Sequence, residues 1–401
     1  MKKIYKGRGP GPWLRRNRRS IAVLLAAAVA FALAWAWAHG GEKTQAPQET
    51  DYAEYENGRV TAVLSDNSHP DDASDGGYRG EQALTVLMKT GQYAGQSLLA
   101  HNYIGPLYGG PLKVGDPVTV LISTYTDGTV SATIYEYNRV WVLAGVVLAF
   151  LLVTVLVGGK TGAKSLLGLG LTVLCLIGIL LPALIRGAST VPATFFTCAF
   201  VAIVCFTILG GVDRKSLCAM AGTILGMALS MAFGMAAQAL GHLDGLRLSD
   251  VEPLLQLRQT GSPIGLRGLL TAGIIIGALG AVMDVAMSIS SALWELKTVH
   301  PGLTAGALWR SGMNIGRDMV GTMTNTLILA FLGSSFTLIL YLYSLELPVH
   351  ELLSSAYLSI EVISGIASSV GVILAVPLTA GIAALLFGAK AQESDAPQSG
   401  K

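Results

Sequence analysis

Eight long apolar runs are separated along the chain by polar or glycine-containing segments. A helix needs about 20 mostly apolar residues to cross the ~30 Å hydrocarbon core of a membrane. The pattern therefore predicts eight membrane-spanning helices, at about 20–38, 140–157, 165–185, 192–210, 217–240, 268–291, 319–343 and 357–387.

The segment between the first two runs has a different pattern, with apolar residues at every second position. Such alternation is typical of half-buried strands, and Gly and Asp mark the turns between them. Five short runs show it: GRVTAVL, EQALTVLMKTG, GQSLLAHNYI, DPVTVLIST and VSATIYEYN. They predict a small OB-like or SH3-like β-barrel, whereas residues 40–52 and 65–79 are polar and predict a linker and a loop. A role in packing and a role in binding an oligosaccharide or peptide both stay open.

Lys and Arg set the expected orientation, because cytoplasmic loops carry an excess of both. The strongly basic residues 1–19 predict a cytoplasmic tail, and the alternating loops then place these cations inside: Lys160, Lys164, Arg214, Lys215, Lys297, Arg310 and Arg317. Residues 20–38 are either an uncleaved anchor or a cleaved signal. In both cases residues 39–138 form an extracytoplasmic β-rich domain, 139–388 a seven-helix domain and 389–401 a cytoplasmic tail.

Composition supports a mainly α-helical polytopic membrane protein, since 52% of residues are hydrophobic and only 13% are charged. Soluble domains carry about 25% charged residues. Outside the amino-terminal tail no basic stripe indicates nucleic acid as a partner. The four cysteines, Cys175, Cys198, Cys205 and Cys218, all lie in or beside apolar runs and are expected to be buried without a disulfide framework.

Several sequence patterns resemble motifs of known enzymes, but each lacks a required residue. GGKTG at 158–162 lacks the first glycine of a phosphate loop, where Thr154 stands. HELLS at 350–354 has Ser354 where a zinc-protease helix needs its second His. No His lies inside a predicted span, so an intramembrane Ser–His pair has no base. We therefore predict no catalytic residue, no metal and no cofactor, and not an enzyme.

Polar residues inside three predicted spans recur in steps of three and four, which places them on one stripe of each helix. The stripes contain Asp284, Ser288, Ser291 and Glu295; Asn314, Asp318, Thr322 and Asn325; and Glu361, Ser364, Ser368 and Thr379. Each includes a carboxylate, and such groups normally face a bundle interior or a wet cavity. We expect a shared ion or proton path lined by Asp284, Ser288, Asn314, Arg317, Asp318, Thr322, Asn325 and Glu361.

The free energies of membrane insertion indicate that the span containing Asp284 can insert, but with little margin. An Asp near the centre of a span costs about 2.5–3.5 kcal/mol, and the Leu, Ile and Val residues between Leu269 and Ile289 together offset about 4 kcal/mol. Asp318 has a structural alternative, because it could cap a helix or pair with Arg317 or Arg310.

Small residues predict where helices approach closely. One ridge is formed by Gly222, Gly226, Ser230 and Gly234, and a second by Gly273, Gly277 and Ala281. Thr304 is a suitable N-cap for a helix lying at the membrane interface, which either runs on into the seventh predicted span or forms a short re-entrant segment.

Three long segments resemble a known family: GALGAVMDVAMSISSALWEL, RSGMNIGRDMVGTMTNTLILAFLGSS and SVGVILAVPLTAGIAALL. They look like the YibE/F-like multitransmembrane proteins of bacteria. The resemblance implies a bacterial cell membrane protein with an outer β-rich segment and a helical domain, in a family without a settled activity. It also implies functional interest in Asp284, Asn314, Arg317, Asp318, Asn325 and Glu361. Ser364 stands where the family pattern carries an Arg, which argues against a fixed ion pair at Glu361.

Three hypotheses follow from these patterns. The first is a cation- or proton-coupled transporter or permease-like protein whose intramembrane carboxylates carry the coupling. The second is a non-transporting membrane scaffold of the cell envelope that acts through its β domain. The third is a buried acid network that only fixes helix register. Expected partners are membrane lipid, an unknown small solute or ion, and either a second copy or another membrane protein.

Overall fold

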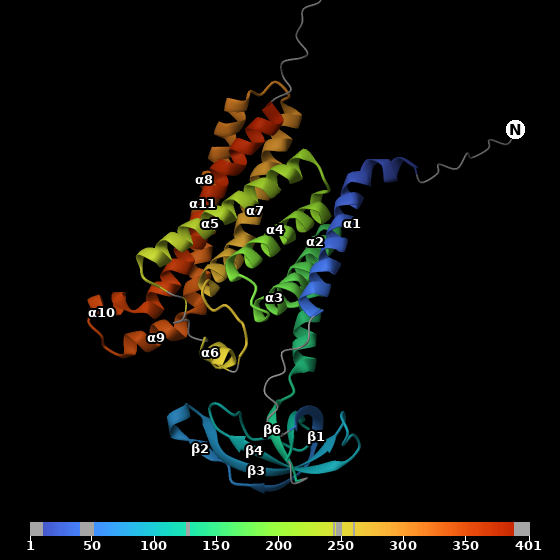
Figure 1. Cartoon of the computed structure of the whole chain (residues 1–401), viewed down its shortest axis with the longest axis vertical. Coiled ribbons are helices and arrows are strands. Elements are labelled where there is room, and N and C mark those ends of the chain that lie inside the picture. The colour runs from blue at the N-terminus through green and yellow to red at the C-terminus, as the bar shows by residue number, and fades with distance from the viewer. Residues whose placement is uncertain are drawn as a thin grey trace, which may run out of the picture. The chain divides into compact units, whose positions relative to one another are not determined.

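The computed structural model describes residues 11–40, 52–125, 129–243, 245, 251–259 and 261–388 (Figure 1). The expected tails lie partly outside these residues, as does most of the expected linker at 40–52. The chain divides into two compact units. One contains residues 45–157, and the other combines residues 1–44 with 158–401.

The first unit contains a closed five-stranded barrel, which confirms the five predicted strands. Its strands are β1 (Tyr52–Asp66), β3 (Gly77–Met88), β4 (Ser97–Ile104), β5 (Pro117–Thr124) and β6 (Val130–Tyr137). The order is β1-β5-β6-β4-β3, and β3 pairs again with β1. All pairs are antiparallel except β4 with β6.

Closure depends on the length of β1. Its first half pairs with β5 and its second half with β3, and Gly58 takes part in both ladders. Register shifts after Val60 and Val63 mark irregularities of the kind that bend a strand. Inward-facing Val60, Leu84, Val86, Val118 and Val120 fill the core with the remaining alternate residues.

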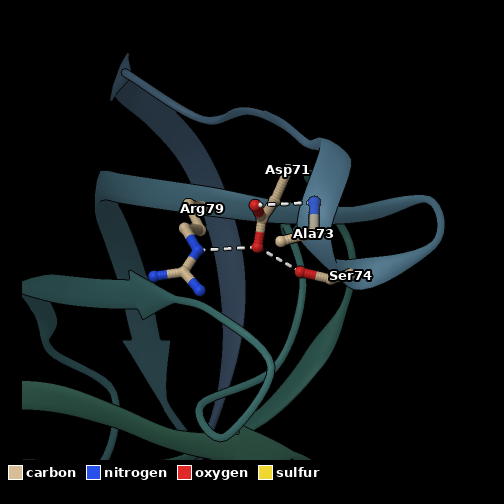
Figure 2. A network of polar contacts seen from close by, with 4 residues as sticks. All are labelled: Asp71, Ala73, Ser74 and Arg79. Carbon is tan, nitrogen blue, oxygen red and sulfur yellow. Dashed lines mark hydrogen bonds and ion pairs between the residues drawn. The ribbon is translucent and has the colours of Figure 1, made fainter.

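The segment 65–79 is more ordered than the predicted loop. It contains the short strand β2 (His69–Asp71), which pairs with β3, and the 3₁₀ turn η1 (Asp72–Ser74). Figure 2 shows the reason: Asp71 accepts hydrogen bonds from the Ala73 backbone amide, the Ser74 hydroxyl and Arg79 Nε. These bonds close the turn, so the expectation of a plain loop was wrong here.

The helices belong to the second unit, except that the first part of α2 belongs to the unit that contains the barrel. Their bounds are α1 (Gly11–His39), α2 (Val140–Cys175), the π-helical turn η2 (Leu176–Leu180), α3 (Leu181–Ile185), α4 (Thr190–Gly210), α5 (Arg214–Leu240), α6 (Glu252–Gln259), α7 (Leu269–Val299), α8 (Ala305–Ser334), α9 (Phe336–Ser344), α10 (Val349–Ser354) and α11 (Ala356–Gly388). Helix α11 packs against α5, α7 and α8 and forms the centre of the helical unit (Figure 1).

Six helical segments in the described part of the chain are long and apolar enough to cross a membrane, and there are seven if the bent pair α8–α9 counts as one span. One of the six, Val140–Ile185, has 46 residues, and its backbone leaves the helical conformation at Gly159 (φ 54°, ψ −135°). A division at Gly159 would give the predicted eight. These apolar helices indicate a multi-pass membrane protein, and the count of eight stays a prediction.

Close packing follows the small residues of α5. A methyl group added at Gly226 would lie 2.8 Å from Val282 and 3.1 Å from Ala375, which confirms this ridge as a contact surface. The second predicted ridge was wrong at Gly273, which has open space around it, whereas Gly277 faces Phe331. All four cysteines are buried and free, as expected.

Candidate functional site

The break between α8 and α9 brings a hydroxyl to an acid of another helix. The two helices meet at Ser335 with a bend of 61°. Ser335 ends α8 and precedes α9, and its backbone (φ −94°, ψ 8°) departs from helical geometry. Its hydroxyl donates a hydrogen bond of 2.5 Å to Glu361 Oε2 in the second turn of α11.

An apolar cavity of about 240 Å³ surrounds this pair. Ser335 and Glu361 supply the polar side chains of its wall, and the other lining residues are Ile328, Phe331, Leu332, Ile339, Leu358, Val362, Gly365 and Ile366. A carboxylate has about four lone-pair positions, and within the described residues only one is occupied by a side-chain donor. Glu361 therefore retains capacity for a proton or a cation.

Asp284 lies elsewhere on the helical unit. Helix α7 buries Val282, Val285 and Ile289 against its neighbours, and Asp284 and Ser288 lie exposed on its other side. Asp284 has no hydrogen-bond or ion-pair partner within the part of the chain that the structure describes. The Glu361 cavity does not include it.

The polar stripe of α8 also lies outside the bundle. Asn314, Arg317, Asp318, Thr322 and Asn325 are all exposed. The buried side of this helix carries the glycines Gly312 and Gly316. A methyl group added at Gly312 would lie 2.7 Å from Ala380 Cβ, and one added at Gly316 would overlap Val376 Cγ1.

This arrangement corrects the expectation that three acidic stripes face one interior. Small side chains let two helix backbones approach, so the glycine face of α8 packs on α11 and its polar face is left outward. Of the expected path residues, Glu361 alone lines the cavity at the helix break. The function of the expected path residues stays a prediction.

The polar stripe of α11 is buried, but its side chains do not bond to one another. Ser364 bonds to the Ile360 carbonyl of its own helix, and Ser368 bonds to the Ile274 carbonyl of α7. Thr379 Oγ1 is buried and has no partner in the described structure. The stripe therefore does not form a continuous polar path.

Two sets of polar groups were not predicted from the sequence. Ser335 was not singled out, although Gly and Ser pairs commonly mark sharp helix kinks and Gly333-Ser334-Ser335 interrupts an apolar run. The hydroxyls of Ser216 and Thr223 on α5 were also missed, and both are buried without a partner in the described structure. Their spacing of seven residues, continued at Ser230, was the available signal.

A polar cleft of about 240 Å³ is found on the barrel. Its charged lining groups are Asp116, Glu136 and Arg139, and its aromatic ones are Tyr108 and Tyr137. Glu136 and Arg139 form an ion pair, and Arg139 lies 5.8 Å from the ring centre of Tyr137. No group of three His, Cys, Asp or Glu residues among those described lies close enough to hold a metal ion.

The family is decided by the match of a family model, described as YibE/F-like protein, over residues 146–389. The chain belongs to the YibE/F-like family. The matched region covers α7, α8 and α11 with their acids, and the barrel lies before it. No curated protein and no solved structure matches the chain.

Proposed function

We propose that this YibE/F-like protein is a cation- or proton-coupled membrane transporter whose coupling group is Glu361. The observation that carries the proposal is the pairing of a carboxylate with a broken span. Transporters commonly form their sites at discontinuous helices, where backbone groups leave the helical pattern. An ionisable residue at membrane depth is also a functional candidate in its own right.

Glu361 and Ser335 have different roles in this proposal. The carboxylate binds a proton or a monovalent cation, and the hydroxyl holds one carboxylate oxygen toward the bend. Binding of a proton or a monovalent cation neutralises the carboxylate and so lowers the cost of moving it past the apolar wall of the cavity. The bend at Ser335 supplies a place where α9 can move relative to α8.

The proposed location is a bacterial cell membrane, with residues 39–138 outside the cytoplasm. The distribution of Lys and Arg supports this orientation. The barrel order, with β4 parallel to β6, supports the OB-like interpretation of that domain. In this proposal the protein is not an enzyme and requires no cofactor.

Reconstitution tests the proposal. Vesicles carrying the full chain and an internal pH dye receive an imposed Na⁺ or K⁺ gradient, and proton flux is recorded. We expect flux in the wild type, loss in Glu361→Gln and a reduced rate in Ser335→Ala. Glu351→Gln is the control, because Glu351 is exposed on α10. Wild-type vesicles no faster than empty ones, or a folded Glu361→Gln protein with full flux, would refute the assignment.

A scaffold acting through the barrel is the second candidate, favoured by the polar cleft at Asp116, Glu136 and Arg139. Deletion of residues 53–138 separates the two in cells. If this deletion abolishes the cellular phenotype while Glu361→Gln leaves it unchanged, the scaffold hypothesis is correct and the transporter proposal is wrong.

A further inference from the structure

The outward face of α8 carries four groups that need partners. Asn314, Arg317, Asp318 and Asn325 are exposed and make no side-chain hydrogen bond or ion pair within the described structure. Thr322 differs, since its hydroxyl bonds to the Met319 carbonyl of its own helix. We call these four residues the α8 polar face.

Arg317 lies more than three turns inside α8, although the sequence placed it in a cytoplasmic loop and began the span at residue 319. Gly312 lies against Ala380 and Gly316 against Val376, so α8 runs antiparallel to α11. Val376 is 12 residues before the end of α11, which corresponds to about 18 Å at 1.5 Å per residue. Asp318 follows Gly316 and therefore lies at the level of the apolar middle of α11.

The close packing of α8 on α11 prevents α8 from turning its polar face inward. Turning the polar face inward would take Gly312 and Gly316 away from α11, where no larger side chain has room. The helix is therefore held with its polar face outward, and hydrocarbon satisfies neither a charge nor an amide. A second polar surface in the same membrane would supply the partners that these groups lack in the described structure.

We propose that the α8 polar face is the interface with a second copy of this chain. Arg317 and Asp318 are adjacent, so they lie at nearly the same depth and about 100° apart around the helix. A twofold axis along the membrane normal places two parallel α8 helices face to face. Each Arg317 then meets the other copy's Asp318, as flanking charges pair across parallel coiled coils.

Asn325 supports the same geometry. It lies two turns beyond Asp318 on the same face, where two symmetry-related amides can donate to and accept from each other. Such central Asn pairs fix the register of parallel helix dimers. The surface is thus complementary to itself in both charge and hydrogen bonding, which a different partner would have to match independently.

A charge-exchange experiment tests the pairing in the full chain. Single-molecule photobleaching in nanodiscs should show wild-type dimers, and Arg317→Asp or Asp318→Arg alone should reduce the dimer fraction at least tenfold. Differently tagged Arg317→Asp and Asp318→Arg chains, expressed together, should recover mixed dimers, since one copy then has two acids and the other two bases. Lys164→Asp, an exposed reversal on α2, should leave dimers unchanged.

Cross-linking in native membranes covers the case in which charge variants fail to fold. Asn325→Cys should form a disulfide-linked dimer upon oxidation, and Phe196→Cys, exposed on α4, should not. The native cysteines are buried and give a low background. A monomeric wild type, absent mixed dimers, or equal cross-linking at both positions would overturn the proposal and indicate a different membrane protein as the partner.

Discussion

The barrel and the helical unit differ in how completely their buried polar side chains are hydrogen-bonded. In the barrel, Gln82 and Asn102 are buried but bonded: Gln82 Oε1 accepts from Asn102 Nδ2 at 3.0 Å and from the Leu112 amide at 2.9 Å. In the helical unit, Ser216, Thr223 and Thr379 are buried without partners in the described structure. Other buried hydroxyls of the helical unit, such as those of Ser230 and Ser368, do bond to a backbone carbonyl. The difference between the two units therefore lies in these unpaired hydroxyls, which lie among closely packed small residues.

The largest expected effect is that of Gly312→Ala. The added methyl would lie 2.7 Å from Ala380 Cβ and 2.9 Å from Leu293 Cδ1, so α8 and α11 must separate. We expect a loss of about 3 kcal/mol, at the upper end of overpacking costs, measured by thermal unfolding in detergent. Gly280→Ala is the control, because an added methyl would meet no described atom of another element within 4 Å and helix propensity favours Ala. Equal melting of the two variants would contradict the role of close packing.

Gln82→Leu should destabilise the barrel by about 2 kcal/mol, because it leaves the Leu112 amide without its acceptor and removes a donor to Asp66. Hydrogen exchange of the full chain should rise in residues 105–116. Gln96→Leu, at an exposed position, should leave exchange there unchanged. Unaltered protection in Gln82→Leu would show that the amide network does not hold this loop.

Thr223→Val should have the opposite sign in the helical unit. The hydroxyl is buried without a partner in the described structure, so a methyl of similar size should raise stability by about 1 kcal/mol. Ser230→Ala should lower stability by a similar amount, since its hydroxyl donates to the Ala367 carbonyl at 2.9 Å. A loss in both variants would mean that Thr223 has a bonded role.

The smallest effect concerns Asp71. Hydrogen bonds from Ser74 and Arg79 lower the pKa of the Asp71 carboxyl from 3.8 to about 2. A depressed pKa contributes stability that is complete above about pH 4 and is lost as the pH falls toward 2. Asp71→Asn should increase hydrogen exchange in residues 69–79 at neutral pH and remove its acid dependence. An unchanged acid profile would assign that dependence to another carboxyl.

Much of the fold was predictable because its signals are local. Alternation identified all five barrel strands, and Thr304 was predicted as the N-cap of α8, where it accepts from the Ala307 amide. Strand β2 was not predictable from alternation, since it depends on bonds from Ser74 and Arg79 to Asp71. Spacing within the segment gives no sign of those contacts.

The candidate site was predictable only in part. Periodicity identified Glu361 as an acid inside a span, but its partner Ser335 belongs to another helix and was found only in three dimensions. Helix α8 carries both a glycine face and a polar face, and periodicity does not decide which one packs. The close approach at Gly316 decides it, and this approach depends on Val376 in a distant segment.

The double pairing of β1 has a consequence for solubility. Both edges of β1 are paired, so this strand offers no row of free amides and carbonyls for a foreign strand to extend. Two edges remain among the described strands. One is β2, which has three residues and includes Pro70, whose nitrogen has no hydrogen to donate. The other is the seam between β4 and β6, which the single pair His101–Thr133 joins. Aggregation by strand addition is therefore blocked at β1, and a strand from another protein could extend this sheet only at β2 or at the β4–β6 seam.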